Sequence, residues 1–202
     1  MTPPKIGIII LAAGSSSRLG EAKQLLQIGE RNLIQHVVGE ANKTNPYRIV
    51  VVTGAYHLEI KESLNGFMVQ IVHNKYWQKG MGSSIRLGIA AITNLDQTLD
   101  AVLLSVSDQP YITAGLFKNL IQKFIKTKKG IVASRYQETF GTPTLFSKSL
   151  FPELSGLPVS TGAKKLFASH ANDLESVDFP LGYIDIDTID DYTAYLKGCP
   201  LS

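Results

Sequence analysis

The sequence predicts an α/β protein with a mostly parallel sheet between two layers of helices. Up to Gly130, apolar runs rich in β-branched residues alternate with segments whose apolar residues recur at helical spacing. Runs that are apolar throughout are typical of parallel strands, because helices cover both faces of such a sheet. These two observations predict a Rossmann-like, three-layer α/β/α fold.

Strands and helices are expected to alternate in this first part of the chain. The run IGIIIL is continuously apolar, and RIVVVTG ends at a turn-forming glycine. The segments between such runs have the spacing of amphipathic helices, as in AGLFKNLIQKFIK. Strands are expected at 6–11, 48–54, 68–74 and 100–108, and helices at 31–43, 55–64, 83–94 and 114–126.

The pattern is less regular after Gly130, where two strand-like runs follow each other with only a short connection. We therefore expect a small antiparallel excursion of the sheet here, together with a surface for an acceptor substrate. Ser160 is expected to cap a helix. Strands are expected at 130–137, 142–147, 174–180 and 183–187, and helices at 160–170 and 188–198.

Length and composition favour a single domain, 1–202, because 44% of the 202 residues are hydrophobic and can form a substantial core. The net charge of +3 is scattered along the chain. Its one local concentration is interpreted as the solvated end of a helix, so no nucleic acid partner is expected. That concentration consists of Lys123, Lys126, Lys128 and Lys129.

We expect a cytoplasmic protein. The single cysteine, Cys199, excludes a disulfide within the chain and a cysteine-based zinc site, which suits a reducing compartment. No run approaches the ~18 consecutive apolar residues of a membrane span. The apolar run 6–13 is too short for a secretory signal, so no membrane partner is expected.

The loop Gly14–Lys23 is the first candidate site, because ligands of open parallel sheets bind at the carboxyl ends of the strands. Its glycine lets the backbone approach an anion closely, and Arg18 and Lys23 supply positive charge. A Walker loop would need a glycine at Leu19, and a dinucleotide fingerprint would need glycines at Ser16 and Leu19. The loop therefore indicates an anion site of another kind, with an ordinary glycine turn as the alternative.

Carboxylates at two further strand ends are candidate metal ligands. Asp108 follows an expected strand, and Mg²⁺ in proteins takes one or two carboxylates together with phosphate oxygens. Asp185 and Asp187 are expected on one face of the strand 183–187, beside the same metal. The alternatives are that Asp108 caps the helix that follows it, and that Asp187 and Thr188 cap the last helix.

A glycine-rich loop before the helix expected at 83–94 is a candidate site for a base or ribose. Gly82 offers backbone contacts and Ser84 a hydroxyl group, although a serine N-cap after a glycine turn is the alternative. Tyr76 and Trp77 are interpreted as packing residues. The four histidines are scattered, so neither a histidine metal site nor a catalytic histidine is expected.

Four motifs together resemble the nucleotidyltransferases that act on the molybdenum cofactor. They are LAAGSSSRLGEAKQLL, GMGSSIRLGI, SDQP and DIDTIDDY, and the resemblance extends over essentially the whole chain. It implies the fold of nucleotide-diphospho-sugar transferases, with a nucleotide-binding half at about 1–112 and an acceptor-binding half at about 113–202. Ala13 stands where guanylyl-transferring relatives tend to have glycine, which favours the cytidylyltransferases and hence CTP.

The resemblance also implies roles for individual residues. Arg18, Lys23 and Asp108 would be catalytic. Nucleotide contacts would come from Leu11, Ala12, Ala13, Gly14, Ser15, Arg18, Lys23, Gly82 and Ser84. Mg²⁺ would be the cofactor, held by Asp108 with Asp187 or Asp185.

The implied reaction transfers CMP from CTP to the phosphate of molybdopterin and releases pyrophosphate. A molybdoenzyme or its chaperone would receive the product. The segment Val159–Lys164 departs from the family pattern, because Ser160 and Thr161 replace the usual Gly-Asp. A sugar phosphate or another phosphorylated acceptor is therefore one alternative, and a non-catalytic carrier of the molybdenum cofactor is another.

Overall fold

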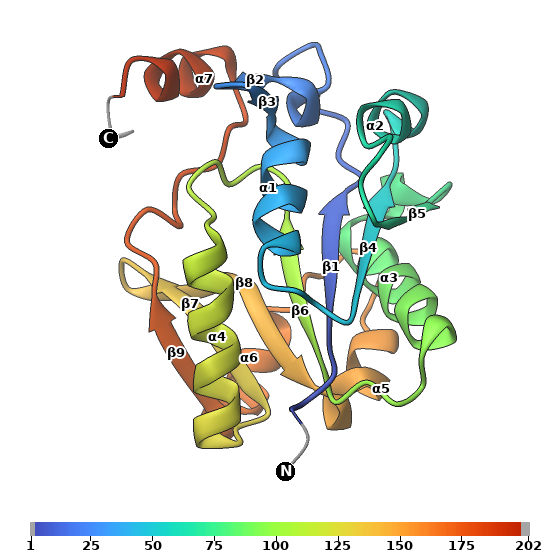
Figure 1. Cartoon of the computed structure of the whole chain (residues 1–202), viewed down its shortest axis with the longest axis vertical. Helices are drawn as coiled ribbons and strands as arrows, with labels where there is room; N and C mark the ends of the chain where they lie inside the picture. The colour runs from blue at the N-terminus through green and yellow to red at the C-terminus, as the bar shows by residue number, and fades with distance from the viewer. Residues whose placement is uncertain (1–2, 199–202) are drawn as a thin grey trace.

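The protein is built around one seven-stranded sheet with helices on both faces (Figure 1). The structure, a computed structural model, describes residues 3–198, so Cys199 lies outside the described residues. The strands of the main sheet are β1 (Ile6–Ala12), β4 (Arg48–Thr53), β5 (Gln70–His73), β6 (Ala101–Val106), β7 (Ile131–Tyr136), β8 (Thr139–Ser147) and β9 (Leu174–Asp178). A short antiparallel pair is formed by β2 (Gln27–Ile28) and β3 (Arg31–Asn32).

Seven α-helices and four short 3-10 helices connect and cover these strands. The α-helices are α1 (Leu33–Asn42), α2 (His57–Ser63), α3 (Met81–Leu95), α4 (Ala114–Thr127), α5 (Phe151–Ser155), α6 (Lys165–Ser169) and α7 (Ile189–Leu196). The 3-10 helices are η1 (Lys23–Leu25), η2 (Trp77–Lys79), η3 (Lys148–Leu150) and η4 (Ala171–Asp173).

The strand order β5-β4-β1-β6-β8-β7-β9 confirms the mostly parallel sheet. The strands β5, β4, β1 and β6 are parallel to their neighbours in this series, whereas β8 runs antiparallel to both β6 and β7. The antiparallel excursion predicted after Gly130 is therefore the β7–β8 hairpin, and β9 pairs parallel with β7.

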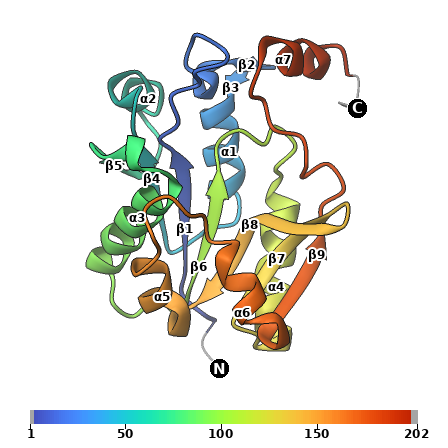
Figure 2. The ribbon, with the colours of Figure 1, turned by 180° about the vertical axis from the view of Figure 1, so that it is seen from behind.

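The side chains of β1 explain the three layers. Ile8 and Ile10 belong to a core cluster that includes residues of α1, α2 and α4, while Ile9 and Leu11 belong to a second cluster with residues of α3, α5 and α6. Successive side chains of a strand point to opposite faces, so a strand that is apolar at every position serves both clusters. Figure 2 shows α3, α5 and α6 on the face opposite to α1 and α4.

Two secondary-structure predictions in the C-terminal part are wrong. Residues 183–187 alternate apolar and acidic side chains like a strand, but they form an irregular segment in which Ile186 N donates to Asp108 O at 2.9 Å. Ser160 caps no helix, because it lies in a turn and α6 begins only at Lys165. The turn around Ser160 packs instead against the start of α3, where a Cβ on Gly82 would clash with the carbonyl of Pro158.

Two glycines in helices give a test of this packing. A Cβ on Gly88 of α3 would lie 2.7 Å from Ile9 Cγ2, whereas a Cβ on the exposed Gly115 of α4 would meet only Thr113 Oγ1 at 3.6 Å. We expect Gly88→Ala to destabilise the protein by about 1–3 kcal/mol through overpacking. Gly115→Ala should be neutral or stabilising by about 0.5 kcal/mol. Urea denaturation of both variants checks this, and equal effects would contradict it.

Candidate functional site

A cavity of about 200 Å³ lies where the loops after β1 and β6 meet the beginning of α3. It is therefore at the carboxyl ends of the central parallel strands, where open α/β sheets bind ligands. The cavity is lined by Leu11, Ala13, Gly14, Lys23, Gln24, Trp77, Gly80, Met81, Ser84, Val106, Ser107 and Asp108.

The loop after β1 folds back on itself through hydrogen bonds of Ser16. This residue has a left-handed backbone conformation, with φ of 51°, and its carbonyl accepts from the N–H of Leu19 at 2.9 Å. Its side-chain Oγ accepts from the N–H of Lys23 at 3.0 Å. The fully buried Gln24 donates through Nε2 to the carbonyl of Gly14 at 3.2 Å. Side chains of the loop and of η1 thus hold the backbone of Gly14 at the cavity.

Gly14 and Gly54, at the carboxyl edge of the sheet, differ in how closely other protein atoms approach them. Gly54, after β4, packs directly on the backbone of Ala13, so a Cβ there would clash with the Ala13 carbonyl. A Cβ on Gly14 would meet no protein atom within 4 Å. Protein packing therefore requires Gly54 but not Gly14, and the bare backbone of Gly14 leaves room for a ligand in the cavity.

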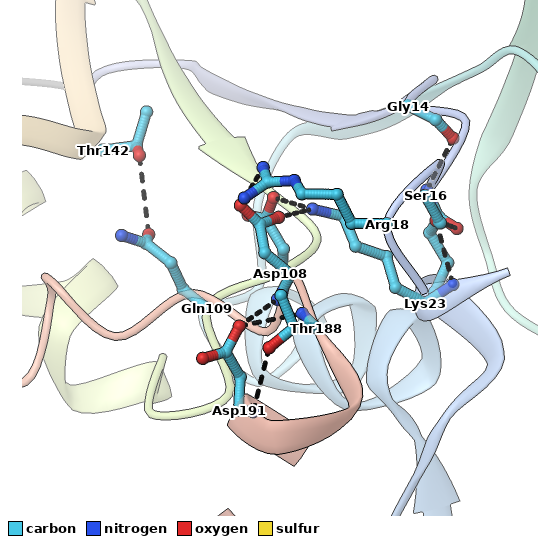
Figure 3. Close-up of polar contacts among 11 residues, drawn as sticks. Gly14, Ser16, Arg18, Lys23, Asp108, Gln109, Thr142, Thr188 and Asp191 are labelled. Atoms are coloured by element: carbon cyan, nitrogen blue, oxygen red, sulfur yellow. Dashed lines mark hydrogen bonds and ion pairs between the residues drawn. The ribbon is translucent and has the colours of Figure 1, made fainter. Parts of the chain in front are cut away.

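An ionic cluster joins three distant segments beside the cavity (Figure 3). Lys23 Nζ lies 2.7 Å from Asp108 Oδ2 and 2.7 Å from Asp187 Oδ1. Arg18 Nη2 lies 2.7 Å from the other oxygen, Asp187 Oδ2. The Lys23 side chain is only 11% exposed, whereas that of Arg18 is 68% exposed. The bridge through Lys23 is therefore the sheltered part of the cluster.

The cluster shifts the pKa values of its members. Burial alone would lower the pKa of Lys23, but Asp108 and Asp187 outweigh it and raise that pKa, so the ammonium stays charged. Burial opposes ionisation of Asp187 as well, yet Lys23 and Arg18 lower its pKa. Asp187 is therefore ionised, and its two oxygens contact two cationic side chains.

Asp185 behaves in the opposite way. Loss of hydration, together with the negative charges of Asp108 and Asp187, raises its pKa to about 7. Asp185 is nevertheless one of the solvent-exposed residues, so the repulsion by two neighbouring carboxylates carries the greater physical weight. Asp185 thus adds to the excess of negative charge around Lys23.

Backbone hydrogen bonds fix Asp187 at the start of α7. Asp191 Oδ2 accepts from the N–H of Asp187 at 3.0 Å and from that of Thr188 at 2.8 Å, and Thr188 Oγ1 accepts from the N–H of Asp191. Thr188 is therefore the cap of the last helix, as the alternative interpretation had it. Asp108 caps no helix, because the cap of α4 is Thr113.

The structure brings half of the predicted site residues to the cavity wall. These are Leu11, Ala13, Gly14, Lys23, Ser84 and Asp108. Ala12 points into the core, the carbonyl of Ser15 accepts from Tyr56, and Gly82 packs on the turn 158–161. Arg18, Asp185 and Asp187 belong to the cluster beside the cavity rather than to its lining.

Sequence reasoning missed several residues of the cavity wall, and Gln24, Met81 and Trp77 are the clearest cases. Gln24 adjoins Lys23 in the motif, and its full burial despite an amide side chain is the structural reason why it matters. Trp77 was interpreted as a packing residue, but it contributes to the wall. Nothing in its surrounding sequence distinguishes these roles.

The described part of the chain, 3–198, contains no group of three or more His, Cys, Asp or Glu side chains placed to hold a metal ion. A cation in the cluster would therefore have at most two protein carboxylates as close ligands. In the same range, no helix has the length and apolar character needed to cross a bilayer.

The parallel sheet, with a glycine loop and paired carboxylates at its carboxyl edge, is typical of proteins that bind nucleotides. A family model described as the MobA-like NTP transferase domain matches residues 8–174. The chain belongs to this family of NTP transferase domains. Motifs along the whole chain had predicted this class.

Known proteins similar to this chain share the fold over nearly their full length. Rv0371c of Mycobacterium tuberculosis H37Rv is 26% identical and superposes with a TM-score of 0.84, covering 98% of this chain and 100% of its own. A manganese complex of Rv0371c covers 96% of this chain and 98% of its own, with 22% identity and a TM-score of 0.78. A nucleotidyl transferase from Methanothermobacter covers 96% and 97%, with 19% identity and a TM-score of 0.81.

Curated relatives match a shorter segment. The bifunctional protein GlmU of Francisella tularensis subsp. novicida is 32% identical over 118 residues, which is 57% of this chain and 25% of GlmU. The chain thus spans about a quarter of the length of the curated relatives that it matches.

The raised pKa of Asp185 predicts a pH-dependent stability. The folded protein holds this proton more tightly than the unfolded chain, so the group lowers the free energy of unfolding as the pH rises from 3.8 to about 7. Asp185→Asn should therefore be more stable than the parent at pH 8 in EDTA, and the difference should shrink toward pH 4. Urea denaturation across this range measures it, with the exposed Asp190→Asn as control. A pH-independent difference would contradict the expectation.

Proposed function

We propose that this protein transfers CMP from CTP to the terminal phosphate of molybdopterin. An oxygen of that phosphate attacks the α-phosphorus of CTP, the bond from the α-phosphorus to the bridging oxygen breaks, and pyrophosphate leaves. The observation that carries the proposal is the Lys23 ammonium between Asp108 and Asp187 at the rim of the cavity. Nucleotidyl transfer depends on positioning and charge neutralisation, so it needs no side-chain nucleophile.

The carboxylates of the cluster fit a divalent cation. They already hold one positive group, since a single ammonium contacts an oxygen of Asp108 and an oxygen of Asp187 at 2.7 Å. Mg²⁺ prefers one or two carboxylates together with phosphate oxygens, and when bound it neutralises phosphate charge. Asp108 and Asp187 would hold it, and the manganese complex of Rv0371c supports a divalent cation here. Asp185 would remain a neighbour whose charge strengthens the attraction.

Lys23 would exchange partners when the nucleotide binds. Its ammonium and a metal ion compete for the same carboxylate oxygens, so both cannot occupy the bridging position. Lys23 also lines the cavity, within reach of a triphosphate there. We propose that Lys23 moves from the carboxylates to the phosphates, as the resemblance implied, and that Arg18 joins it from the exposed side. The buried Gln24 would keep Gly14 in place during this exchange.

A second cavity offers space for the acceptor. It measures about 330 Å³ and shares Leu11, Met81 and Val106 with the nucleotide cavity. Phe167 contributes an apolar face, and Lys164 contributes an ammonium that lies 5.7 Å from the ring centroid of Tyr136. An acceptor with a flat ring system and a phosphate suits this combination, because the ring can pack on Phe167 while the phosphate pairs with Lys164.

The choice of CTP rests on Ala13. This residue is 8% exposed and lines the nucleotide cavity, and its carbonyl packs against Gly54. Its methyl group takes space that a glycine would leave free, which favours the smaller pyrimidine base.

A different phosphorylated acceptor, such as a sugar phosphate, is the second candidate. The segment that departs from the family pattern forms part of the acceptor cavity, where Ser160 and Gly162 line the wall. Hydroxyl groups there would suit a polar acceptor. In either case we propose that the product passes to a protein that uses it, a molybdoenzyme or its chaperone if the acceptor is molybdopterin.

A turnover assay tests the proposed function. Purified protein with Mg²⁺ and molybdopterin should release pyrophosphate with CTP and far less with GTP, UTP or ATP. Replacing molybdopterin by a panel of sugar phosphates should abolish the release. Faster release with a purine nucleotide would contradict the base assignment, and release with a sugar phosphate alone would contradict the acceptor.

The same assay separates an enzyme from a carrier. Asp108→Asn should lower pyrophosphate release by about 100-fold or more while the protein still melts cooperatively. A non-catalytic carrier would hand molybdopterin to an acceptor protein equally well with and without this substitution.

Gly14→Ala gives a further prediction, because no protein atom would contact the added methyl group. We expect thermal stability to be unchanged and the Kd for CTP, measured by isothermal titration calorimetry, to rise by about tenfold or more. Gly115→Ala is the matched control and should leave the Kd unchanged. Unaltered CTP binding by Gly14→Ala would show that the nucleotide does not approach this backbone.

A further inference from the structure

A third hollow, of about 600 Å³, lies on the other side of the nucleotide cavity's wall. It runs between the end of β5, η2, the outer face of α3 and the segment after α5. We call it the basic groove and define it by Lys75, Tyr76, Lys79, Arg86, Leu87 and Val159. Adjacent residues divide between the two hollows, since Trp77 and Ser84 face the nucleotide cavity whereas Tyr76 and Ser83 face the groove.

The basic groove gathers positive charge without a counter-charge. No acidic residue lines it, and within residues 3–198 neither Lys75 nor Arg86 forms an ion pair. The Lys79 ammonium lies over the ring of Tyr76, with Nζ 4.7 Å from its centroid. Like charges that share a concave surface repel each other and attract anions. This arrangement favours an anionic ligand.

The floor of the groove is apolar. The ring of Tyr76 belongs to a side chain in a residue that is 66% exposed. Leu87 and Ala90, about one turn apart on α3, also line the groove. A ligand that carries only phosphate would leave these apolar surfaces uncovered. A polypeptide with both acidic and apolar side chains would cover the cations and the floor together.

The neighbouring strand offers backbone partners to such a polypeptide. β5 is an edge strand of the sheet, and among the described strands it pairs only with β4 (Figure 1). Its last residue, His73, lies in the lining of the groove. The free edge of a strand binds extended peptides through main-chain hydrogen bonds.

We propose that the basic groove binds an extended acidic segment of a partner protein. The segment lies along the free edge of β5, with its carboxylates on Lys75, Lys79 and Arg86 and its apolar side chains on Tyr76 and Leu87. A single layer of residues would separate the bound segment from the nucleotide cavity. The side-chain amide of Asn74 spans that layer, donating to Ser83 Oγ at 2.8 Å and to Ser84 Oγ at 2.9 Å.

Fluorescence anisotropy tests the proposal with a fluorescein-labelled octapeptide of alternating Glu and Leu, without nucleotide or metal. We expect saturable binding that Lys75→Glu and Arg86→Glu each weaken at least about tenfold. Lys118→Glu and Lys126→Glu on α4, across the sheet, change the net charge equally and should weaken binding less than about twofold. A peptide with Gln in place of Glu should not bind, and thermal melting verifies the fold of each variant.

Three outcomes would overturn the proposal. They are absence of saturable binding, equal weakening by the α4 variants, and retention of affinity by the Gln peptide. Tripolyphosphate, titrated separately by isothermal titration calorimetry, identifies a small-anion site if it binds the parent protein more tightly than Lys75→Glu while the peptide does not bind. Because nucleotide is omitted, failure here leaves the proposed transferase activity untouched, and failure of the turnover assay leaves this result untouched.

Discussion

The bridge formed by Lys23 holds the site together. Its ammonium joins the loop after β1 to Asp108, 85 residues later, and to Asp187, 164 residues later. The sheet does not reach the last of these partners, because residues 183–187 form no strand and α7 buries none of its residues. Ile186, packed with Leu26 and Leu33, is the main apolar anchor of that segment. The Asp187 carboxylate is thus placed by the burial of Ile186, by backbone hydrogen bonds to Asp191 and by its ion pairs with Lys23 and Arg18.

An ionic bridge of this kind contributes little to stability, because the charged groups lose hydration when they are buried. Apolar side chains of similar volume could join the same segments without this desolvation penalty. Two carboxylates contact the sheltered ammonium of Lys23, and their negative charges contribute to raising the pKa of the nearby Asp185 to about 7. An arrangement of this kind suits a second cation better than it suits stability. The oxygens of Asp108 and Asp187 that contact Lys23 here are therefore the same oxygens that would hold the proposed metal ion.

The geometry of the first loop also explains why it matches no common phosphate-binding motif. In Walker and dinucleotide motifs, glycines permit a tight turn from a strand directly into a helix whose N-terminus faces the phosphates. Here no α-helix follows β1 directly, since η1 and the β2–β3 pair intervene and α1 begins only at Leu33. The positions that would need glycine, Ser16 and Leu19, lie in a loop held by side-chain hydrogen bonds. In the proposed nucleotide complex, the side chains of Arg18 and Lys23 would take the place of a helix N-terminus.

The sequence predicted what depends on local pattern and missed what depends on tertiary contact. β1 and β6 are apolar at nearly every position because both faces are covered, and this pattern is visible without a structure. The period-two pattern of Tyr183–Asp187 did not predict the structure correctly, because these residues pair with no strand. Ile186 is buried against the β2–β3 region and Asp187 contacts Lys23, so tertiary contacts produce the alternation without a sheet. Gly82 shows another effect of tertiary contact. The sequence indicated a close approach to its backbone, and in the structure the close neighbour is Pro158 of the same chain.

The contact between the turn 158–161 and the start of α3 joins the linings of the three hollows. Gly80 and Gly82 allow the turn 158–161 to lie directly on the start of α3, and a Cβ on Gly80 would be 2.8 Å from the carbonyl of Val159. Ser160 lines the acceptor cavity, Val159 lines the basic groove, and Gly80 lines the nucleotide cavity. Because the linings of all three hollows meet at one glycine-dependent contact, a substitution in the turn 158–161 is expected to change the proposed acceptor cavity and the basic groove without changing the sheet.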